Sequence, residues 1–166
     1  MSNVKQVHYD ILPIKSKKAD INLIYGEKSN GKSYQVKSNV ALEDYLTESV
    51  KEYVKSGFRF ILLRRWREDV TNLWVEKYFS DIDVKKITKG KYNIITVYKK
   101  EIYFSIANED GKVKRVEKIG YVMSLSTEQH FSSGSFLDVK NIIFEEFMER
   151  RRSLFTERAR TLVNFL

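Results

Sequence analysis

One stretch of the sequence, GEKSNGKS at residues 26–33, has residue types and spacing that suit phosphate binding, because it matches G-x-x-x-x-G-K-[ST]. The glycines let the backbone bend so that successive N–H groups point at phosphate oxygens. Lys32 is predicted to reach the β- and γ-phosphates, and the Ser33 hydroxyl is predicted to bind Mg²⁺. We therefore expect ATP with Mg²⁺ as the ligand, held by a continuous run of residues: Gly26, Glu27, Lys28, Ser29, Asn30, Gly31, Lys32, Ser33 and Tyr34.

Two adjacent acids, Glu145 and Glu146, follow the apolar run VKNIIF at residues 139–144. An apolar strand that ends in acids, downstream of a phosphate loop, is the Walker B pattern. Glu145 is predicted to hold magnesium through water, and Glu146 to polarise the water that attacks the γ-phosphate. The alternative is that both glutamates are solvated and open a helix, where acids are favoured. The two motifs together predict ATP hydrolysis, with Lys32 and Glu146 as catalytic residues.

These residues need a scaffold of strands and helices to position them. The apolar run INLIY at 21–25 predicts a buried parallel strand, and apolar residues recur at roughly helical spacing over about 31–55. FRFILL at 58–63 predicts a second strand, parallel to the first with a right-handed crossover. A second helix is expected over 66–80, with Leu73 and Tyr78 on its apolar stripe.

Two arginines, Arg64 and Arg65, come directly after the second predicted strand. In an open α/β sheet, ligands bind beyond the carboxyl ends of the strands. Both arginines are therefore candidates for a phosphate sensor or an inter-subunit contact. The alternative is that one is solvated and the other forms a salt bridge.

The remaining segments predict an α/β fold with a mostly parallel sheet flanked by helices and an added antiparallel β meander. Residues 21–80 form the βαβα core, 81–125 the meander, and 126–166 a polar loop, the Walker B strand and an arginine-rich helix. Turns are predicted at Asn108–Gly111 and, from a weaker signal, at Lys99–Glu101. The meander is rich in lysine, which suggests either a strip that faces DNA or a solvated hairpin surface.

Composition narrows the classes of function. The chain has 166 residues, no cysteine, and two histidines that are far apart in sequence, so neither disulfides nor a zinc site are expected. Its net charge of +8 suggests a polyanionic partner, most often nucleic acid, although a basic surface without a partner is the alternative. No segment approaches the length of a membrane-spanning helix, so we expect no membrane partner and a location in the cytoplasm of the cell or host.

Three stretches, GEKSNGKSY, FILLRRW and YVMSLSTEQHFSSGSFLDVKNIIFEEF, resemble the ATPase domain of the DNA-packaging motors of phi29-like tailed bacteriophages. Those terminase-like encapsidation ATPases are P-loop proteins of the additional-strand, catalytic-glutamate (ASCE, RecA-like) class, near the HerA/FtsK-like translocases. The resemblance implies an ATP-driven motor that moves double-stranded DNA into a viral procapsid. It also implies a homo-oligomeric ring, a pentamer, that works at the portal of the procapsid in the host cytoplasm.

The resemblance also carries over to individual residues. Lys32 and Ser33 stand at the phosphate and magnesium positions, and Lys28 stands where the family has a basic residue inside the loop. Glu146 stands at the catalytic glutamate. Glu145 stands where the family has aspartate, so its side chain is longer by one methylene group.

In that class, the strand between the P-loop strand and the Walker B strand comes from sequence after Walker B. Here only twenty residues follow Glu146, so the resemblance predicts an incomplete domain without the C-terminal part of the family architecture. Two other functions stay open. One is a nucleotide kinase-like phosphotransferase, and the other is a truncated ATP-binding module without turnover.

Overall fold

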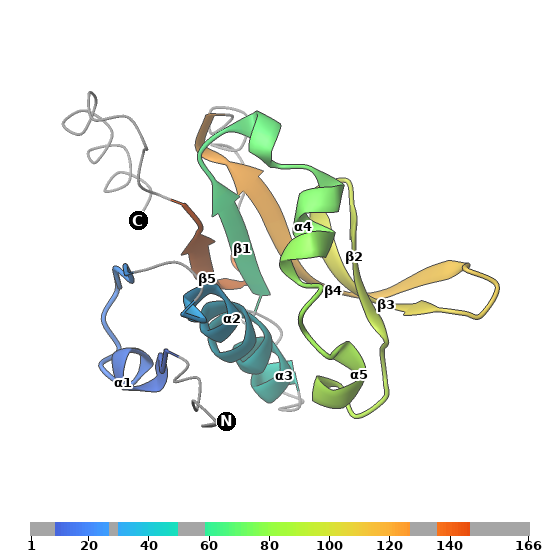
Figure 1. The fold of residues 1–166 in the computed structure, drawn as a ribbon, viewed down its shortest axis with the longest axis horizontal. Coiled ribbons are helices and arrows are strands. Elements are labelled where there is room, and N and C mark those ends of the chain that lie inside the picture. The colour runs from blue at the N-terminus through green and yellow to red at the C-terminus, as the bar shows by residue number, and fades with distance from the viewer. Residues whose placement is uncertain (1–8, 27–29, 50–58, 127–135, 147–166) are drawn as a thin grey trace, which may run out of the picture.

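The computed structural model describes residues 9–26, 30–49, 59–126 and 136–146. Their centre is a five-stranded sheet in the order β2-β3-β4-β1-β5 (Figure 1). β1 pairs in parallel with β4 on one side and with β5 on the other, whereas β2, β3 and β4 pair in antiparallel fashion. The strands are β1 (Arg59–Arg64), β2 (Ile94–Tyr98), β3 (Glu101–Ala107), β4 (Val113–Ser124) and β5 (Val139–Phe144).

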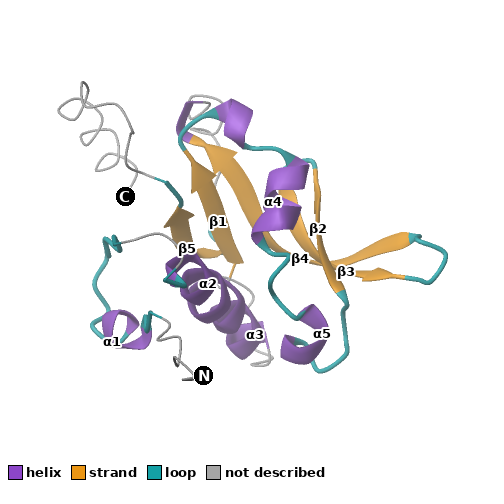
Figure 2. Ribbon diagram, viewed as in Figure 1, coloured by secondary structure: helices purple, strands orange, loops and turns teal. Residues whose placement is uncertain are grey.

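The longest helical segment runs without a break through α2 (Lys32–Val36), a π-helical stretch (Lys37–Leu42) and α3 (Glu43–Ser49). Figure 2 shows α2, α3 and α4 in front of the sheet, on one of its faces. The other helical segments are short: α1 (Leu12–Lys15), a 3₁₀ turn (Arg67–Asp69), α4 (Asn72–Tyr78) and α5 (Val84–Ile87).

The core follows from the two-residue period of the strands. In β1, Phe60 and Leu62 are fully buried beneath the helices, where they share a cluster with Leu42 and Val75. The intervening residues of β1 face the opposite side of the sheet, where Leu63 packs with Met123 and other apolar side chains. Both faces of β1 are therefore covered, which agrees with its unbroken apolar sequence.

Both predicted hairpin turns are present, and the predicted strand at 58–63 appears as β1. Lys99 and Lys100 join β2 to β3 with left-handed φ values of 47° and 65°. At the other turn, Gly111 has a φ of 76° and its N–H donates to the Asn108 carbonyl at 3.0 Å. The three meander strands lie at one edge of the sheet and join it through β4, so the described sheet is mixed and not mostly parallel.

Other predicted elements are wrong or shorter. Residues 21–25 form no strand, and Ile21, Leu23 and Tyr25 are 53%, 70% and 77% exposed. The physical reason is that no strand of the described sheet lies beside this run to complete a hydrogen-bonded ladder, since β5 is an edge strand there. The predicted helix at 66–80 shortens to α4, whose Leu73 is 74% exposed.

Some predictions concern parts of the chain outside the described residues. They are the end of the helix expected over 31–55, most of the loop over 126–138, and the helix after Glu146. Within the described ranges, no helix is long and apolar enough to cross a membrane.

Candidate active site

The two ends of the predicted phosphate loop face each other. Gly26 has a φ of 150°, and a Cβ added there would lie 3.5 Å from Asn30 Nδ2 and 3.7 Å from Lys32 Nζ. The Lys32 ammonium group donates to Asn30 Oδ1 at 2.9 Å. Gly31 holds the left-handed conformation, with a φ of 84°, that turns the chain into α2. Both glycines therefore have positive φ values, and Glu27, Lys28 and Ser29 between them lie outside the described residues.

The first residues after the loop open the long helix. Ser33 is in the first turn of α2, and Tyr34, beside it, is 43% exposed. From the N-terminal side, the Tyr9 backbone N–H donates to the Asn30 carbonyl at 3.0 Å. Tyr9, which precedes the loop, and Lys32, near its end, therefore both contact Asn30.

The acid pair lies next to this helix start. β5 runs alongside β1, and the Glu145 N–H continues the pairing by donating to the Leu63 carbonyl at 3.1 Å. Glu145 Oε2 accepts a hydrogen bond from the Ser33 hydroxyl at 3.4 Å, and these two residues are 112 positions apart in sequence. Strand pairing and the helix start together bring the two predicted magnesium ligands into contact.

The chemistry of this pair fits a magnesium ion. A hydroxyl and a carboxylate are hard oxygen donors of the kind that Mg²⁺ prefers, and Mg²⁺ commonly takes one or two protein ligands and completes its shell with water and phosphate oxygens. Within the described residues, no group of three or more His, Cys, Asp or Glu side chains is placed to hold a metal ion. The donor atoms of Ser33 and Glu145 are therefore chemically compatible with the predicted ion.

A residue that the sequence did not single out orients Glu145. Tyr78, at the end of α4, donates its hydroxyl to Glu145 Oε1 at 2.7 Å. Burial raises the pKa of Tyr78 well above its usual value, and the negative charge of Glu145 adds to the rise. The phenol therefore keeps its proton and acts as a donor. Its only sequence signal was a place on the predicted apolar stripe, which indicated packing and not a polar role.

Tyr78 is itself held by the long helix. Lys37 is buried in the π-helical stretch, and its ammonium group donates to the Tyr78 carbonyl, pairs with Asp81 and lies 4.8 Å from the centre of the Tyr78 ring. Single π-helical turns inside α-helices are frequent at functional sites. Lys37 therefore ties the helix that begins at the phosphate loop to the tyrosine that orients Glu145.

The second acid has a different partner. Glu146 Oε2 lies 3.2 Å from Arg64 Nη1, and Glu146 has a left-handed φ of 53°. The Arg64 guanidinium carbon lies 4.5 Å from the centre of the Trp74 ring. Among the described residues, Arg64 Nε is a buried polar atom without a hydrogen-bond partner. Arg64 thus has one N–H group directed at Glu146 and another available to an acceptor that the described chain does not supply.

Arg65 lies at the same end of the sheet, and its carbonyl accepts a hydrogen bond from the Ser126 N–H at 3.1 Å. The structure places Arg64 against the acid pair. The carboxyl end of β1 lies next to the carboxyl ends of β4 and β5, because the three strands are parallel. In an open α/β sheet, ligands bind beyond this edge.

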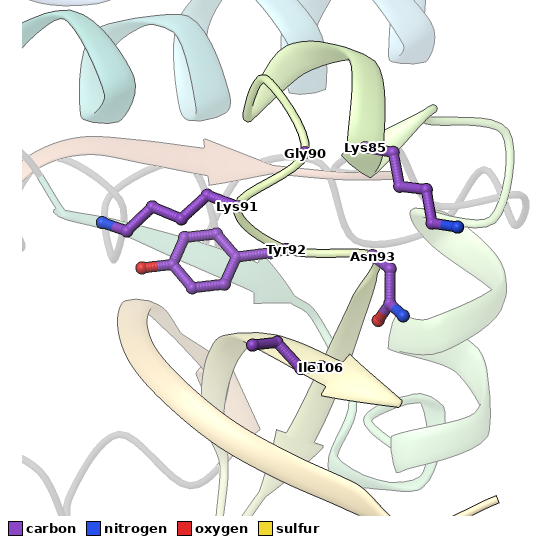
Figure 3. Close-up of a pocket in the computed structure, with 6 residues that line it drawn as sticks. All are labelled: Lys85, Gly90, Lys91, Tyr92, Asn93 and Ile106. Carbon is purple, nitrogen blue, oxygen red and sulfur yellow. The ribbon is translucent and has the colours of Figure 1, made fainter. Parts of the chain in front are cut away.

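A small cavity of about 130 Å³ lies elsewhere, between α5 and the start of β2. Figure 3 shows Lys85 and Lys91 beside it, with side chains that extend in opposite directions, so their ammonium groups do not converge on a shared anion. Asn93 at its wall exchanges two hydrogen bonds with the Ala107 backbone, both at 2.8 Å. This cavity is not part of the site around Ser33 and Glu145.

Sequence comparison finds relatives among phage DNA packaging proteins. The chain is 28% identical over 131 residues to the DNA packaging protein of Bacillus phage B103, and 25% identical over 136 residues to that of Bacillus phage phi29. These matches cover 79% of this chain but 33% and 32% of the relatives, so the chain spans about a third of their length. No protein-family model matches.

Structure comparison also finds phage packaging proteins. The crystal structure of the N-terminal domain of the DNA packaging ATPase from bacteriophage phi29 matches with a TM-score of 0.65 and 23% identity, over 95% of this chain and 69% of that one. The bacteriophage phi29 genome packaging motor assembly matches with a TM-score of 0.62 and 22% identity, over 95% of this chain and 41% of that one. The resemblance to phi29-like packaging proteins is therefore confirmed for the sequence relatives and for the fold.

Proposed function

We propose that this chain is the ATP-hydrolysing part of a motor that packages double-stranded DNA into a phage procapsid. The contact between Ser33 and Glu145 carries the proposal, because it joins the predicted phosphate loop to the predicted Walker B acid across 112 positions of sequence. The packaging role is supported by the names of the relatives and of the matched structures.

In this proposal the run from Gly26 to Tyr34 holds the triphosphate. Backbone N–H groups of the loop and the Lys32 ammonium group bind phosphate oxygens and offset their charge. Ser33 and Glu145 would hold Mg²⁺, which when bound neutralises charge on the β- and γ-phosphates. Tyr78 keeps one oxygen of Glu145 engaged, so that the other is directed at Ser33.

Glu146 is the proposed general base, and Arg64 controls it. In the structure the Glu146 carboxylate is paired with Arg64, which leaves it poorly placed to accept a proton from water. We propose that Arg64 turns toward the γ-phosphate when ATP binds, because a phosphate would satisfy the Arg64 Nε group that has no partner among the described residues. Glu146 is then released to orient the attacking water. Arg65 is kept as the candidate for an inter-subunit contact.

The proposed assembly is a homo-oligomeric ring, a pentamer by family resemblance, that acts on double-stranded DNA at the portal of the procapsid in the host cytoplasm. The proposed fold class is the additional-strand, catalytic-glutamate P-loop class. Support comes from β5, which is an edge strand in the described sheet, because that class places its added strand beside the Walker B strand. We propose that a strand from outside the described residues pairs with the open edge of β5.

The ion pair between Arg64 and Glu146 also favours a second candidate, an ATP-binding module that does not turn ATP over. The two are separated by measuring ATP binding and hydrolysis for the protein, for Lys32→Ala and for Glu146→Gln, with DNA and procapsids present or absent. The motor proposal expects Lys32→Ala to lose binding and Glu146→Gln to bind ATP but lose roughly 10²-fold or more in hydrolysis.

Three results would change the conclusion. Binding with no hydrolysis above the Lys32→Ala background, even with DNA and procapsids, favours the binding module. Stimulation of ATP turnover by a nucleoside monophosphate, and not by DNA, favours a kinase-like phosphotransferase. Wild-type hydrolysis by Glu146→Gln removes Glu146 from the mechanism.

A further inference from the structure

Positive charge is concentrated at the sheet edge opposite β5. Residues 84–118, which run from α5 to the middle of β4, contain ten lysines and arginines and four acids. The segment therefore has a net charge of +6, out of +8 for the whole chain. Figure 1 shows that the segment includes the β3–β4 hairpin, which projects from the body of the molecule.

Within this segment, the turn between β2 and β3 has an unusual sequence for its conformation. Lys99 and Lys100 have φ values of 47° and 65°, and two-residue hairpin turns with positive φ at both positions prefer Asn-Gly or similar pairs. A residue with a Cβ is strained in the left-handed region. Strained residues of this kind gather at functional sites, so two consecutive lysines here point to a role for their side chains.

The residue before this turn is an exposed aromatic between two cations. Tyr98 is 44% exposed, with the Arg115 guanidinium carbon 4.3 Å and the Lys99 ammonium group 5.4 Å from the centre of its ring. Arginine, lysine and an exposed aromatic ring together are typical of nucleic-acid surfaces, where cations meet phosphates and rings meet sugars or bases.

In two other cation–tyrosine pairs of the same hairpins, the cation is also paired with a carboxylate. Lys91 lies over the Tyr92 ring but is paired with Glu117 at 3.3 Å, and Lys118 lies over the Tyr121 ring but is paired with Glu101 at 3.0 Å. Within the described part of the chain, neither Lys99 nor Arg115 has a carboxylate at ion-pair distance. The charges around Tyr98 are therefore available to an external anion.

The turn also lies at the same end of the sheet as the candidate active site. The Lys100 carbonyl accepts a hydrogen bond from the Val122 N–H at 2.9 Å, and Ser124, two residues further along β4, is paired with Arg64. One strand thus connects the basic turn to the arginine that binds Glu146.

We infer that Tyr98, Lys99, Lys100 and Arg115, here called the Tyr98 surface, bind the sugar–phosphate backbone of duplex DNA. The choice of DNA over another polyanion rests on the proposed function. Binding is expected to depend on charge and not on base sequence, because contacts of cations with phosphates carry no sequence information.

The test is duplex binding by the full chain, measured by fluorescence anisotropy between 50 and 200 mM salt. The key variant combines Lys99→Asn and Lys100→Gly, which creates a favoured turn sequence while it removes two charges. We expect its melting temperature to rise, its affinity to fall about tenfold, and the slope of log affinity against log salt to become shallower by roughly 2. Arg115→Ala is expected to weaken binding in the same direction.

The matched control combines Lys17→Ala and Lys18→Ala, because these are adjacent, exposed lysines and Lys18 also has a left-handed φ, of 51°. It should bind DNA within about twofold of wild type.

Equal losses of DNA affinity in the control and in the turn variant would overturn the inference, and so would wild-type affinity in the turn variant. Competition by polyglutamate as effective as by DNA would also overturn it, in favour of an acidic protein partner. Failure of the proposed function gives a different result. In that case the wild-type chain would not bind or hydrolyse ATP, but the turn variant would still bind DNA more weakly than wild type.

Discussion

The carboxylate of Glu146 lies 3.2 Å from the guanidinium of Arg64, across the ends of the adjacent parallel strands β5 and β1. Glu146 holds a left-handed backbone conformation in this arrangement, and Arg64 is sandwiched between the acid and the Trp74 ring. The candidate general base is therefore engaged by an arginine of the neighbouring strand.

Arg64→Ala is expected to lower single-turnover ATP hydrolysis by roughly 10²-fold, because it removes the charge that Arg64 is proposed to bring to the γ-phosphate. ATP affinity, measured with a fluorescent analogue, should change far less. Arg67→Ala, an exposed arginine in the following 3₁₀ turn, serves as the control and should behave as wild type. Faster hydrolysis by Arg64→Ala would mean instead that Arg64 only restrains Glu146.

Tyr78→Phe is expected to raise the Mg²⁺ concentration needed for half-maximal hydrolysis by about tenfold, as loss of a residue behind a metal ligand commonly does. The reason is that Glu145 loses the hydroxyl that fixes one of its oxygens. A magnesium titration of ATP hydrolysis measures the effect.

Tyr103→Phe is a matched control for that titration, because Tyr103 also donates its hydroxyl to a carboxylate, that of Glu101, in the meander. It should leave the magnesium requirement unchanged. If both variants shift the requirement equally, the effect is one of general stability, and Tyr78 has no specific role.

Glu117 makes the stability of the meander sensitive to acid. Burial would raise the pKa of Glu117, but hydrogen bonds from the Tyr45 and Tyr92 hydroxyls and the charge of Lys91 outweigh burial and hold this pKa below its usual value. A carboxyl whose pKa is depressed by folding stabilises the folded state above its unfolded pKa, near 4.3, and loses that contribution as pH falls through the folded pKa.

Urea unfolding between pH 3 and 7 is therefore expected to show stability that declines below about pH 4.5. Glu117→Gln should cost about 1–3 kcal/mol at pH 7, because two buried phenols lose a charged acceptor. The difference between the variant and wild type should shrink at pH 3. A difference that is constant with pH would show that Glu117 acts through packing.

Gly120→Ala is expected to destabilise the fold by about 1–3 kcal/mol or more, since an added methyl group overpacks the centre of the sheet. A Cβ at Gly120 would lie 2.6 Å from the Phe60 carbonyl oxygen, on the neighbouring strand β1. Gly90→Ala is a useful comparison, because nothing lies within 4 Å of a Cβ there and only its φ of 83° opposes the change. Thermal unfolding measures both, and a smaller loss at Gly120 than at Gly90 would contradict the steric argument.

Local features of the sequence predicted local features of the molecule. The apolar runs at 58–63 and 139–144 became β1 and β5. Both faces of β1 are covered, as an unbroken apolar run predicts, whereas Ile142 of the edge strand β5 is 41% exposed. Asn108–Gly111 and Lys99–Lys100 became turns, and Gly26 and Gly31 adopted positive φ, because these depend on a few neighbouring residues. The same kind of reasoning was wrong for residues 21–25, since an apolar run becomes a strand only if a partner strand lies beside it.

The sequence by itself determined which side chains are available for chemistry: those of a predicted phosphate loop, an acid pair, an arginine pair and a basic meander. Only the tertiary structure decided which of these meet. Ser33 contacts Glu145, Arg64 pairs with Glu146, and the Tyr78 hydroxyl at the end of α4 donates to Glu145, which directly follows β5. The physical reason is that such contacts depend on strand order and register, which long-range pairing sets and local composition does not.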